Sequence, residues 1–223
     1  MPSVAVVVPA GGTGTRLGRR TPKQYLRVAG IPILLATVRR FRRHPSVRAV
    51  VVAAPAGRLA RTRALLGHSR RVSLVVVEGG ATRQDSVWRA LQAAPEDVDI
   101  VLVHDAVRPF ITARLVDDVI AAAAEHGAAV CALPIAETVK RARHGLVVET
   151  VDRAGLVTVQ TPQGFRAALL REAHDKARRD GVEGTDDAML VERLGHAVRV
   201  VAGLPENVKI TTADDLRRAR RRP

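Results

Sequence analysis

Residues 9–25, PAGGTGTRLGRRTPKQY, decide the fold because they follow an apolar run at 4–8 that predicts a buried parallel strand. A glycine-rich turn after such a strand brings backbone N–H groups close to a ligand, since glycine has no Cβ to hold the ligand off. Arg16 and Lys23 add two cations within the same short segment. Clustered N–H donors and fixed positive charge favour the phosphates of a nucleotide as the ligand.

Two common phosphate-binding motifs do not fit this turn. A dinucleotide-binding G-x-G-x-x-G that starts at Gly12 requires a third glycine where Leu17 stands, and no G-x-x-x-x-G-K-[ST] can be placed in the segment. The sequence therefore disfavours both a dinucleotide dehydrogenase and a P-loop NTPase.

The chain has 223 residues, enough for a full core, and we expect one domain over residues 1–223. Aliphatic residues are abundant while aromatic residues make up 2%, which suits strands covered by helices on both faces. No apolar stretch is long enough to cross a bilayer, and no export segment is evident. Cys131 is the only cysteine and is expected in the core. These features predict a cytoplasmic protein with no membrane partner.

The formal net charge of +14 raises the question of nucleic-acid binding. The few aromatic side chains are scattered rather than interleaved with basic residues, so they offer no platform for stacked bases. The positive charge is almost all arginine, spread over expected helices and a cluster at 217–222. We interpret it as solvated helix faces and expect no nucleic-acid partner.

Apolar runs alternate with helix-like segments through the first 135 residues. This alternation predicts an α/β fold with an open, doubly wound, mostly parallel sheet. The expected strands are 4–8, 47–53, 72–77, 100–103 and 129–133, and the expected helices are 32–44, 58–66, 84–93 and a helix capped by Thr112 that runs to 126.

The most polar segments follow three of these strands directly. They are the glycine turn after the first strand, EGGATR at 78–83 after the third, and HDAVR at 104–108 after the fourth. Ligands of open α/β sheets bind at the carboxyl ends of the strands, so these segments predict one shared cleft.

Residues 136–160 break the alternation. Three short strand-like runs at 139–143, 146–151 and 156–160 are separated by the turns His144-Gly145 and Ala154-Gly155. We expect an inserted, protruding β-arm over about 136–160. An exposed strand pair is only marginally stable, and a second subunit is the expected packing partner. Beyond the arm we expect a helix at 167–179, a capped turn at 185–187 and a strand at 198–201.

Several ordered motifs run along the chain: PAGGTGTRLGRRTPKQY, GGATRQDSV, LVHDAVRP, TVDRAGL, TPQGF, GTDDA and ENVKIT. Together they resemble one family, the 2-C-methyl-D-erythritol 4-phosphate cytidylyltransferases of the non-mevalonate isoprenoid pathway. The similarity runs from about residue 4 to 215. It implies a nucleotide-diphospho-sugar-transferase-like fold, transfer of CMP from CTP to the methylerythritol phosphate with Mg²⁺, and a homodimer whose β-arm reaches into the partner's active site.

The resemblance assigns the nucleotide side of the site. Arg16 and Lys23 match the catalytic pair that stabilises the transition state; the plainer alternative is ordinary surface charge. Asp105 is also a possible ligand of Mg²⁺, although triphosphate oxygens and water are expected to hold the metal chiefly. His104 is expected to be structural, because the attacking phosphate is already anionic and needs no base. The residues implied for CTP are Pro9, Ala10, Gly11, Gly12, Gly14, Gly80, Ser86, Asp105 and Ala106.

The resemblance also assigns the acceptor side. Arg153 and Lys209 match the catalytic residues that hold the acceptor phosphate for attack, with Arg153 acting across the dimer. Hydroxyl-rich pockets suit a polyol, yet threonines are also ordinary strand residues. The residues implied for the acceptor are Arg108, Thr138, Lys140, Arg153, Thr161, Thr185, Lys209 and Thr211.

Two alternatives remain open at this point. A ribitol 5-phosphate cytidylyltransferase would keep the fold and change the acceptor. A non-catalytic nucleotide- or nucleic-acid-binding protein would keep the fold without turnover, although such a protein has no need for cations on both sides of the α-phosphate.

Overall fold

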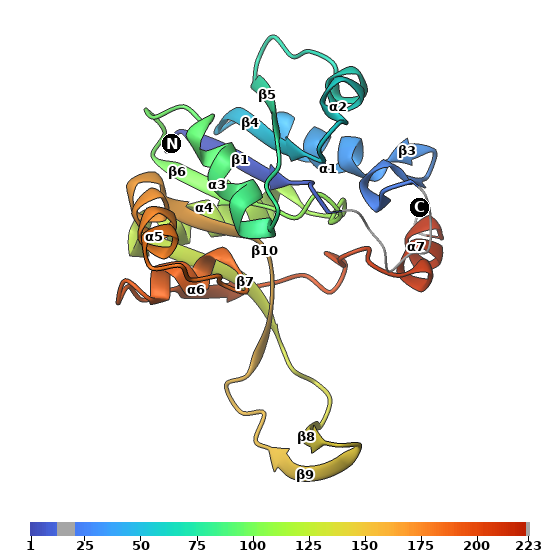
Figure 1. The fold of residues 1–223 in the computed structure, drawn as a ribbon, viewed down its shortest axis with the longest axis vertical. Coiled ribbons are helices and arrows are strands. Elements are labelled where there is room, and N and C mark those ends of the chain that lie inside the picture. Colours follow the sequence, from blue (N-terminus) through green and yellow to red (C-terminus); the bar gives the residue numbers. More distant parts are fainter. Residues whose placement is uncertain (13–20, 222–223) are drawn as a thin grey trace.

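The computed structural model describes residues 1–12 and 21–221 and places a seven-stranded sheet at the centre (Figure 1). The strand order is β11-β7-β10-β6-β1-β4-β5, and only β10 in this described sheet runs antiparallel to its neighbours. The fold prediction of a doubly wound, mostly parallel α/β sheet is therefore confirmed. The strands are β1 (Val4–Pro9), β4 (Val47–Ala54), β5 (Ser73–Glu78), β6 (Ile100–Val103), β7 (Ala128–Pro134), β10 (Val157–Arg166) and β11 (Arg199–Ala202).

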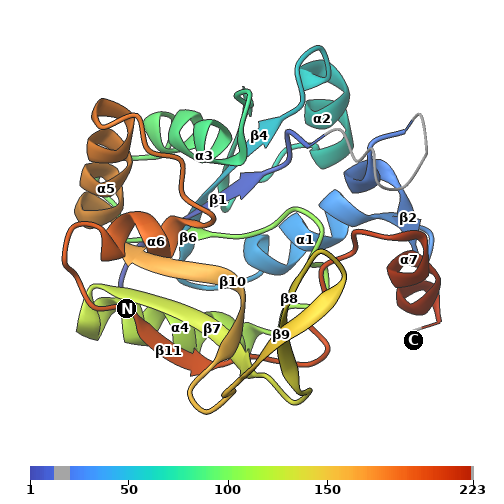
Figure 2. The same cartoon turned by 60° about the horizontal axis from the view of Figure 1, so that its bottom comes forward.

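Helices cover both faces of the sheet, as Figure 2 shows for α3, α5 and α6 on one side and α4 on the other. Alternate residues of β1 enter the two cores, since Val6 packs with the α1 and α4 side chains while Val7 packs with those of α3 and α5. Burial on both faces explains the continuous valine run. The helices are α1 (Ile33–Arg42), α2 (Leu59–Leu66), α3 (Arg83–Gln92), α4 (Ala113–His126), α5 (Ala167–Arg179) and α6 (Asp187–Glu192).

The N-cap expected at Thr112 is confirmed, because its side chain accepts a hydrogen bond from the backbone N–H of Leu115 at 3.2 Å. The helix expected at 167–179 has those bounds, and α6 begins at the expected capped turn. Apart from the run expected at 156–160, the predicted strands agree with the observed ones to within about two residues.

The third strand-like run of the expected arm is longer than the sequence suggested. Residues expected to end at 160 continue as β10 to Arg166 and fill the position between β6 and β7. The pairing with β7 shifts register between Val159 and Gln163, around Pro162, which has no N–H to donate. The sequence did not predict this extension because it contains Pro162 and Gly164, and neither residue favours a strand interior.

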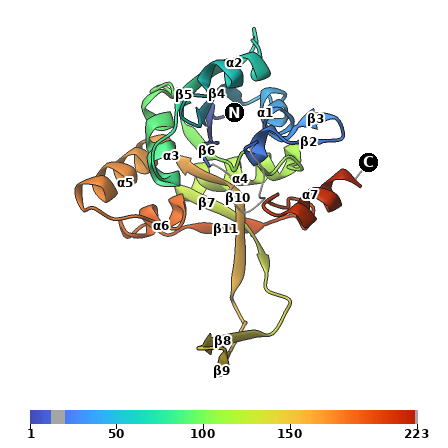
Figure 3. The same cartoon turned by 45° about the vertical axis from the view of Figure 1, so that its right-hand side comes forward.

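The β-arm consists of β8 (Val139–Arg143) and β9 (Leu146–Val151), paired with each other at the end of the β7–β10 ribbon. Figures 1 and 3 show the arm projecting well away from the sheet. Its apolar side chains Leu146, Val147 and Val148 are more than half exposed.

A small unit next to the first strand was not anticipated from the sequence. It combines η2 (Lys23–Tyr25), β2 (Arg27–Val28), β3 (Ile31–Pro32) and α7 (Ala213–Arg220), which starts with a capping box between Thr212 and Asp215. Ile210 and Leu216 pack there against Leu26 and Val107. This core ties the chain near Lys23 to the chain near Lys209. No helix in residues 1–12 and 21–221 is both long and apolar enough to cross a membrane.

Candidate active site

A pocket of about 300 Å³ opens at the carboxyl ends of β1, β5 and β6. The three polar segments that follow these strands meet there, which confirms the expected shared cleft. The sequence-predicted residues that line it are Pro9, Ala10, Gly11, Gly12, Lys23, Gly80, Ser86, Asp105, Ala106 and Lys209. The lining residues that were not expected individually from the sequence are Gln24, Ala81, Thr82, Arg83 and Val107.

The turn after β1 is held by Gln24, whose side chain is buried. Its Nε2 donates to the carbonyl oxygens of Ala10 at 2.6 Å and Gly12 at 3.2 Å. The neighbouring Lys23 thereby reaches the pocket wall. Gly14 and Arg16, both expected at this turn, lie outside the described residues.

The wall formed by residues 80–86 depends on a serine hydroxyl and a glycine. Ser86 Oγ donates to the Thr82 carbonyl at 2.9 Å and accepts from the Gly80 N–H at 3.1 Å. A Cβ on Gly80 would lie 2.2 Å from Asp85 Cβ, so this position accepts no side chain. The hydroxyl of Ser86, one of the residues implied for CTP, is thus engaged in closing the loop that forms the wall.

Asp105 is the buried carboxylate at the centre of the site. Its Oδ2 lies 3.0 Å from Lys209 Nζ and 3.2 Å from Arg108 Nε, and its Oδ1 lies 3.7 Å from Arg83 Nε. Burial alone would raise the pKa of Asp105, but the positive charges of Lys209, Arg83 and Arg108 together hold it well below its usual range. Asp105 is therefore ionised at neutral pH.

The backbone at Asp105 is fixed by a chain of hydrogen bonds through Thr161. The Asp105 N–H donates to Thr161 Oγ1 at 3.0 Å, and this hydroxyl lies 3.2 Å from His104 Nδ1. His104 Nε2 lies 3.0 Å from the Arg108 carbonyl, which can only accept, so the ring proton sits on Nε2 and Thr161 donates to Nδ1. Burial lowers the pKa of His104 to about 4, which keeps the ring neutral. These contacts suit the structural role expected for His104.

Arg108 links Asp105 to the C-terminal segment. Its Nη1 donates to the Asn207 carbonyl at 2.7 Å, and the Ile210 N–H donates to the Val107 carbonyl at 3.0 Å. Lys209 is positioned between these two anchors. Arg108 was expected to contact the acceptor, yet it is buried and lies behind the pocket lining.

Besides Arg108 and Thr161, five further residues expected on the acceptor side do not line the pocket within this chain. Arg153 Nη1 donates to the Ala136 carbonyl, and Lys140 Nζ donates to Thr150 Oγ1 at 2.6 Å on the arm. The other three are Thr138, in the loop before β8, Thr185, next to Met189, and Thr211, which donates to Asp215.

The described residues offer no cluster of three or more His, Cys, Asp or Glu side chains arranged to hold a metal. Asp105, the possible ligand selected from the sequence, already faces three cations. Its surroundings do not fit a protein-held metal site, because a divalent cation there would be repelled by all three.

The fold and the site together define a nucleotidyltransferase, a class in which a glycine turn and fixed cations surround a nucleotide at the carboxyl edge of an α/β sheet. The chain belongs to the 2-C-methyl-D-erythritol 4-phosphate cytidylyltransferase family, whose model matches residues 4–221. The resemblance drawn from the sequence motifs is confirmed.

Relatives support this membership over nearly the whole chain. The 2-C-methyl-D-erythritol 4-phosphate cytidylyltransferase of Symbiobacterium thermophilum is 50% identical over 217 residues, covering 97% of this chain and 91% of the relative. The crystal structure of the enzyme of that name from Thermus thermophilus has 41% identity and a TM-score of 0.81, covering 98% of this chain and 97% of that chain. The 4-diphosphocytidyl-2C-methyl-D-erythritol synthase from Anaerococcus prevotii has 26% identity and a TM-score of 0.86, covering 98% and 97%.

Proposed function

We propose that this enzyme transfers CMP from CTP to 2-C-methyl-D-erythritol 4-phosphate, giving 4-diphosphocytidyl-2-C-methyl-D-erythritol and pyrophosphate. A phosphate oxygen of the acceptor attacks the α-phosphorus of CTP, a new P–O bond forms, and the bond to the pyrophosphate breaks. The attacking group is already an anion, so the site must position two anions and stabilise developing charge.

The observation that carries this proposal is the presence of two lysines from distant segments in one pocket. Lys23 comes from the segment after the glycine turn, and Lys209 comes from the C-terminal segment that pairs with Asp105. Fixed cations of this kind stabilise charge without moving a proton. We assign Lys23, with Arg16, to the CTP phosphates and Lys209 to the acceptor phosphate.

Magnesium is proposed as part of the nucleotide substrate. The three cations around Asp105 disfavour a metal on that carboxylate. Mg²⁺ prefers oxygen ligands, keeps several waters and commonly binds through substrate phosphates. We therefore propose that Mg²⁺ arrives with CTP and is held chiefly by triphosphate oxygens and water. A CTP-dependent reaction also favours the cytoplasm, where CTP is made, as the location.

We further propose a homodimer in which the arm of one protomer completes the acceptor site of the other. Two features support it: the exposed apolar side chains of β9, and the projection of the arm away from the sheet (Figure 3). Packing the arm against a second copy would bury this apolar surface and bring Arg153 and Lys140 to an acceptor.

The experiment is pyrophosphate release from CTP and Mg²⁺ with either 2-C-methyl-D-erythritol 4-phosphate or ribitol 5-phosphate as acceptor. Release with the methylerythritol substrate alone is the expected result. Release with ribitol 5-phosphate alone would replace the acceptor while keeping the reaction class. No release with either acceptor, together with salt-dependent binding to duplex DNA, would favour a binding protein instead.

A further inference from the structure

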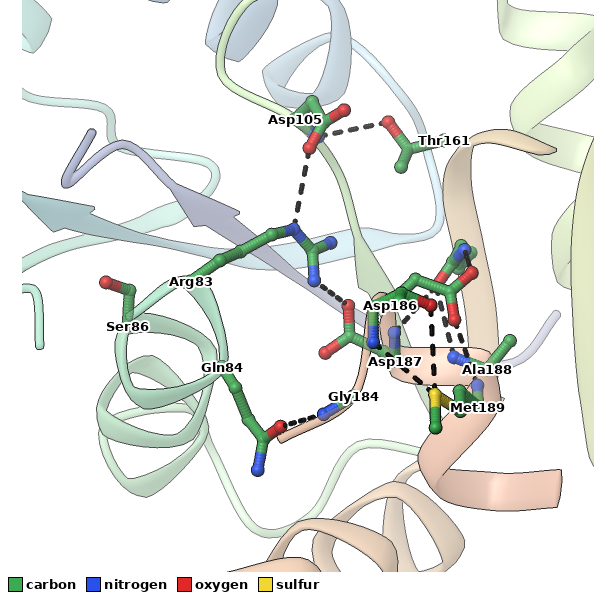
Figure 4. Close-up of polar contacts among 12 residues, drawn as sticks. Arg83, Gln84, Ser86, Asp105, Thr161, Gly184, Asp186, Asp187, Ala188 and Met189 are labelled. Carbon is green, nitrogen blue, oxygen red and sulfur yellow. Dashed lines mark hydrogen bonds and ion pairs between the residues drawn. The ribbon is translucent and has the colours of Figure 1, made fainter. Parts of the chain in front are cut away.

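The first turn of α3 and the segment at 182–187 lie about 100 residues apart in the sequence and are joined by polar contacts, as Figure 4 shows. Arg83 Nη1 lies 2.7 Å from Asp187 Oδ2, at the start of α6. The next residue, Gln84, donates from Nε2 to the Val182 carbonyl at 3.0 Å and accepts from the Gly184 N–H at 2.8 Å. One contact is an ion pair, and the other is a neutral two-point hydrogen bond.

Asp187 is an unusual residue to find in this place, because its side chain is 1% exposed. Burial alone would raise its pKa, but the charge of Arg83 and the hydrogen bond from His174 outweigh it and lower the pKa. His174 Nε2 lies 3.0 Å from Asp187 Oδ1, and the Asp187 N–H donates to Gln163 Oε1 at 3.2 Å. A buried carboxylate costs folding free energy unless it is well paired. Asp187 is thus held on every side, and Arg83 is its charged partner.

Arg83, which pairs with Asp187, also faces Asp105. Arg83 lines the pocket and its Nε faces Asp105 Oδ1 at 3.7 Å, beyond hydrogen-bonding distance. The other oxygen, Oδ2, is occupied by Arg108 and Lys209. Oδ1 of Asp105 therefore lies close to the charge of Arg83, and its lone pairs can still accept a hydrogen bond from a substrate hydroxyl.

We propose that Asp187 and Arg83 are positioning residues for the reaction: Asp187 fixes Arg83, and Arg83 orients Asp105 so that Oδ1 accepts a hydrogen bond from a ribose hydroxyl of CTP. The inference rests on the proposed function, since it takes CTP as the nucleotide. A carboxylate is an acceptor only, so its ligand must be a donor, and ribose hydroxyls are the donors that distinguish CTP from its deoxy analogues.

Attachment of the loop at 182–187 does not by itself require this ion pair. Gln84 already ties that loop to α3 without burying any charge. Arg83 differs from Gln84 because it also reaches the carboxylate in the pocket. The two neighbours thus separate loop attachment from control of Asp105, and Gln84 provides a matched control.

The test measures binding of CTP, 2′-deoxy-CTP and 3′-deoxy-CTP by titration calorimetry, and pyrophosphate release with the same nucleotides. The wild type should prefer CTP by about tenfold over at least one deoxy analogue, the expected loss for a hydrogen bond to a charged group. Asp187→Asn and Arg83→Met should weaken CTP binding by about tenfold and remove most of that preference. Gln84→Ala should keep the preference unchanged.

A double variant distinguishes a loss of the preference for CTP from a loss of folding. Arg83→Met leaves Asp187 buried without its partner, whereas Arg83→Met with Asp187→Asn removes both charges and should regain thermal stability while still lacking the preference for CTP. Three results would overturn the proposal. The double variant could recover the preference for CTP over its deoxy analogues, or the single variants could keep the wild-type preference. The third result is a wild type that binds all three nucleotides equally. Wild type that shows the preference but no turnover with either acceptor would overturn the proposed function alone.

Discussion

The pocket around Asp105 and the β-arm differ in how many contacts determine their geometry. Asp105 is buried, its backbone is held through Thr161, and its carboxylate faces three cations. In the arm, by contrast, β8 and β9 are almost entirely exposed and pair mainly with each other. The pocket is therefore preorganised within one chain, whereas the geometry of the arm would be determined by the second subunit of the proposed homodimer.

The energetics of the two regions should differ accordingly. Charge-assisted hydrogen bonds inside the protein are short and strong, and an unpaired buried charge is costly. Exposed ion pairs are each worth roughly 0–1 kcal/mol. Substitutions at the pocket should act independently of protein concentration, and substitutions on the arm should act through assembly of the proposed homodimer.

The largest effect is expected at the pocket lysine. Lys23→Ala should lower kcat by roughly 10²-fold or more while the fold is retained, by analogy with the loss of one preorganised charge stabiliser. Steady-state pyrophosphate release and circular dichroism measure the two quantities. Lys176→Ala is the matched control, since Lys176 pairs with Asp180 on the surface of α5. Near-normal turnover in folded Lys23→Ala would remove Lys23 from the mechanism.

The next effect concerns the pH dependence of stability. The pKa of His104 falls from 6.5 to about 4 on folding because the ring is buried. Between these values the unfolded chain binds a proton that the folded protein does not, so the free energy of unfolding should rise by roughly 3 kcal/mol as the pH rises through this window.

His104→Gln keeps a side-chain N–H donor and removes the titration. Urea unfolding from pH 4 to 7 should therefore show a shallower rise for this variant than for wild type. The buried carboxylates contribute in a lower window, since their pKa values are lowered from the ordinary carboxyl value of 3.8. Equal slopes in the two proteins would show that His104 does not titrate as its burial implies.

Much of the pocket could be predicted from sequence because its parts are local. The turn at 9–12 and the segments at 78–83 and 104–108 each follow a strand, and parallel strands bring their carboxyl ends to one edge. Lys23 was found because it lies in the same segment as the glycines. Lys209 came only from the family resemblance, since its place depends on a backbone pairing of Ile210 with Val107 across 103 residues (210 minus 107).

The parts that were missed depend on tertiary contacts. The sequence placed Arg83 in the polar segment at 78–83 without a role of its own, and only its tertiary contacts with Asp187 and Asp105 distinguish it from the other arginines. Gln24 was missed because its side chain is uncharged, although it holds the turn after β1. The extension of β10 past residue 160 was also missed, because Pro162 and Gly164 are unfavourable in a strand unless neighbouring residues accommodate them.

A smaller and concentration-dependent effect is expected on the arm. Arg153→Ala should raise the KM for the acceptor by roughly tenfold and leave the KM for CTP nearly unchanged, because no arm residue of the same chain lines the pocket proposed for CTP. Mixing this variant with Lys23→Ala should restore activity, since one site of each mixed dimer then has both residues, or about a quarter of all sites at random assembly. Mixed dimers that stay inactive would contradict an arm that works across the dimer.

The smallest effect is expected from the ion pair on the arm surface, Arg141 Nε to Glu149 Oε2 at 2.7 Å. Both side chains are more than half exposed within the single chain, so the screened attraction barely offsets the cost of ordering them. Glu149→Gln should change the free energy of unfolding by less than about 0.5 kcal/mol and leave turnover unchanged. Thermal unfolding measured at low and high protein concentration tests this. A loss well above that value, seen only at concentrations where the protein is dimeric, would place this pair inside the interface and make the arm as closely determined as the pocket.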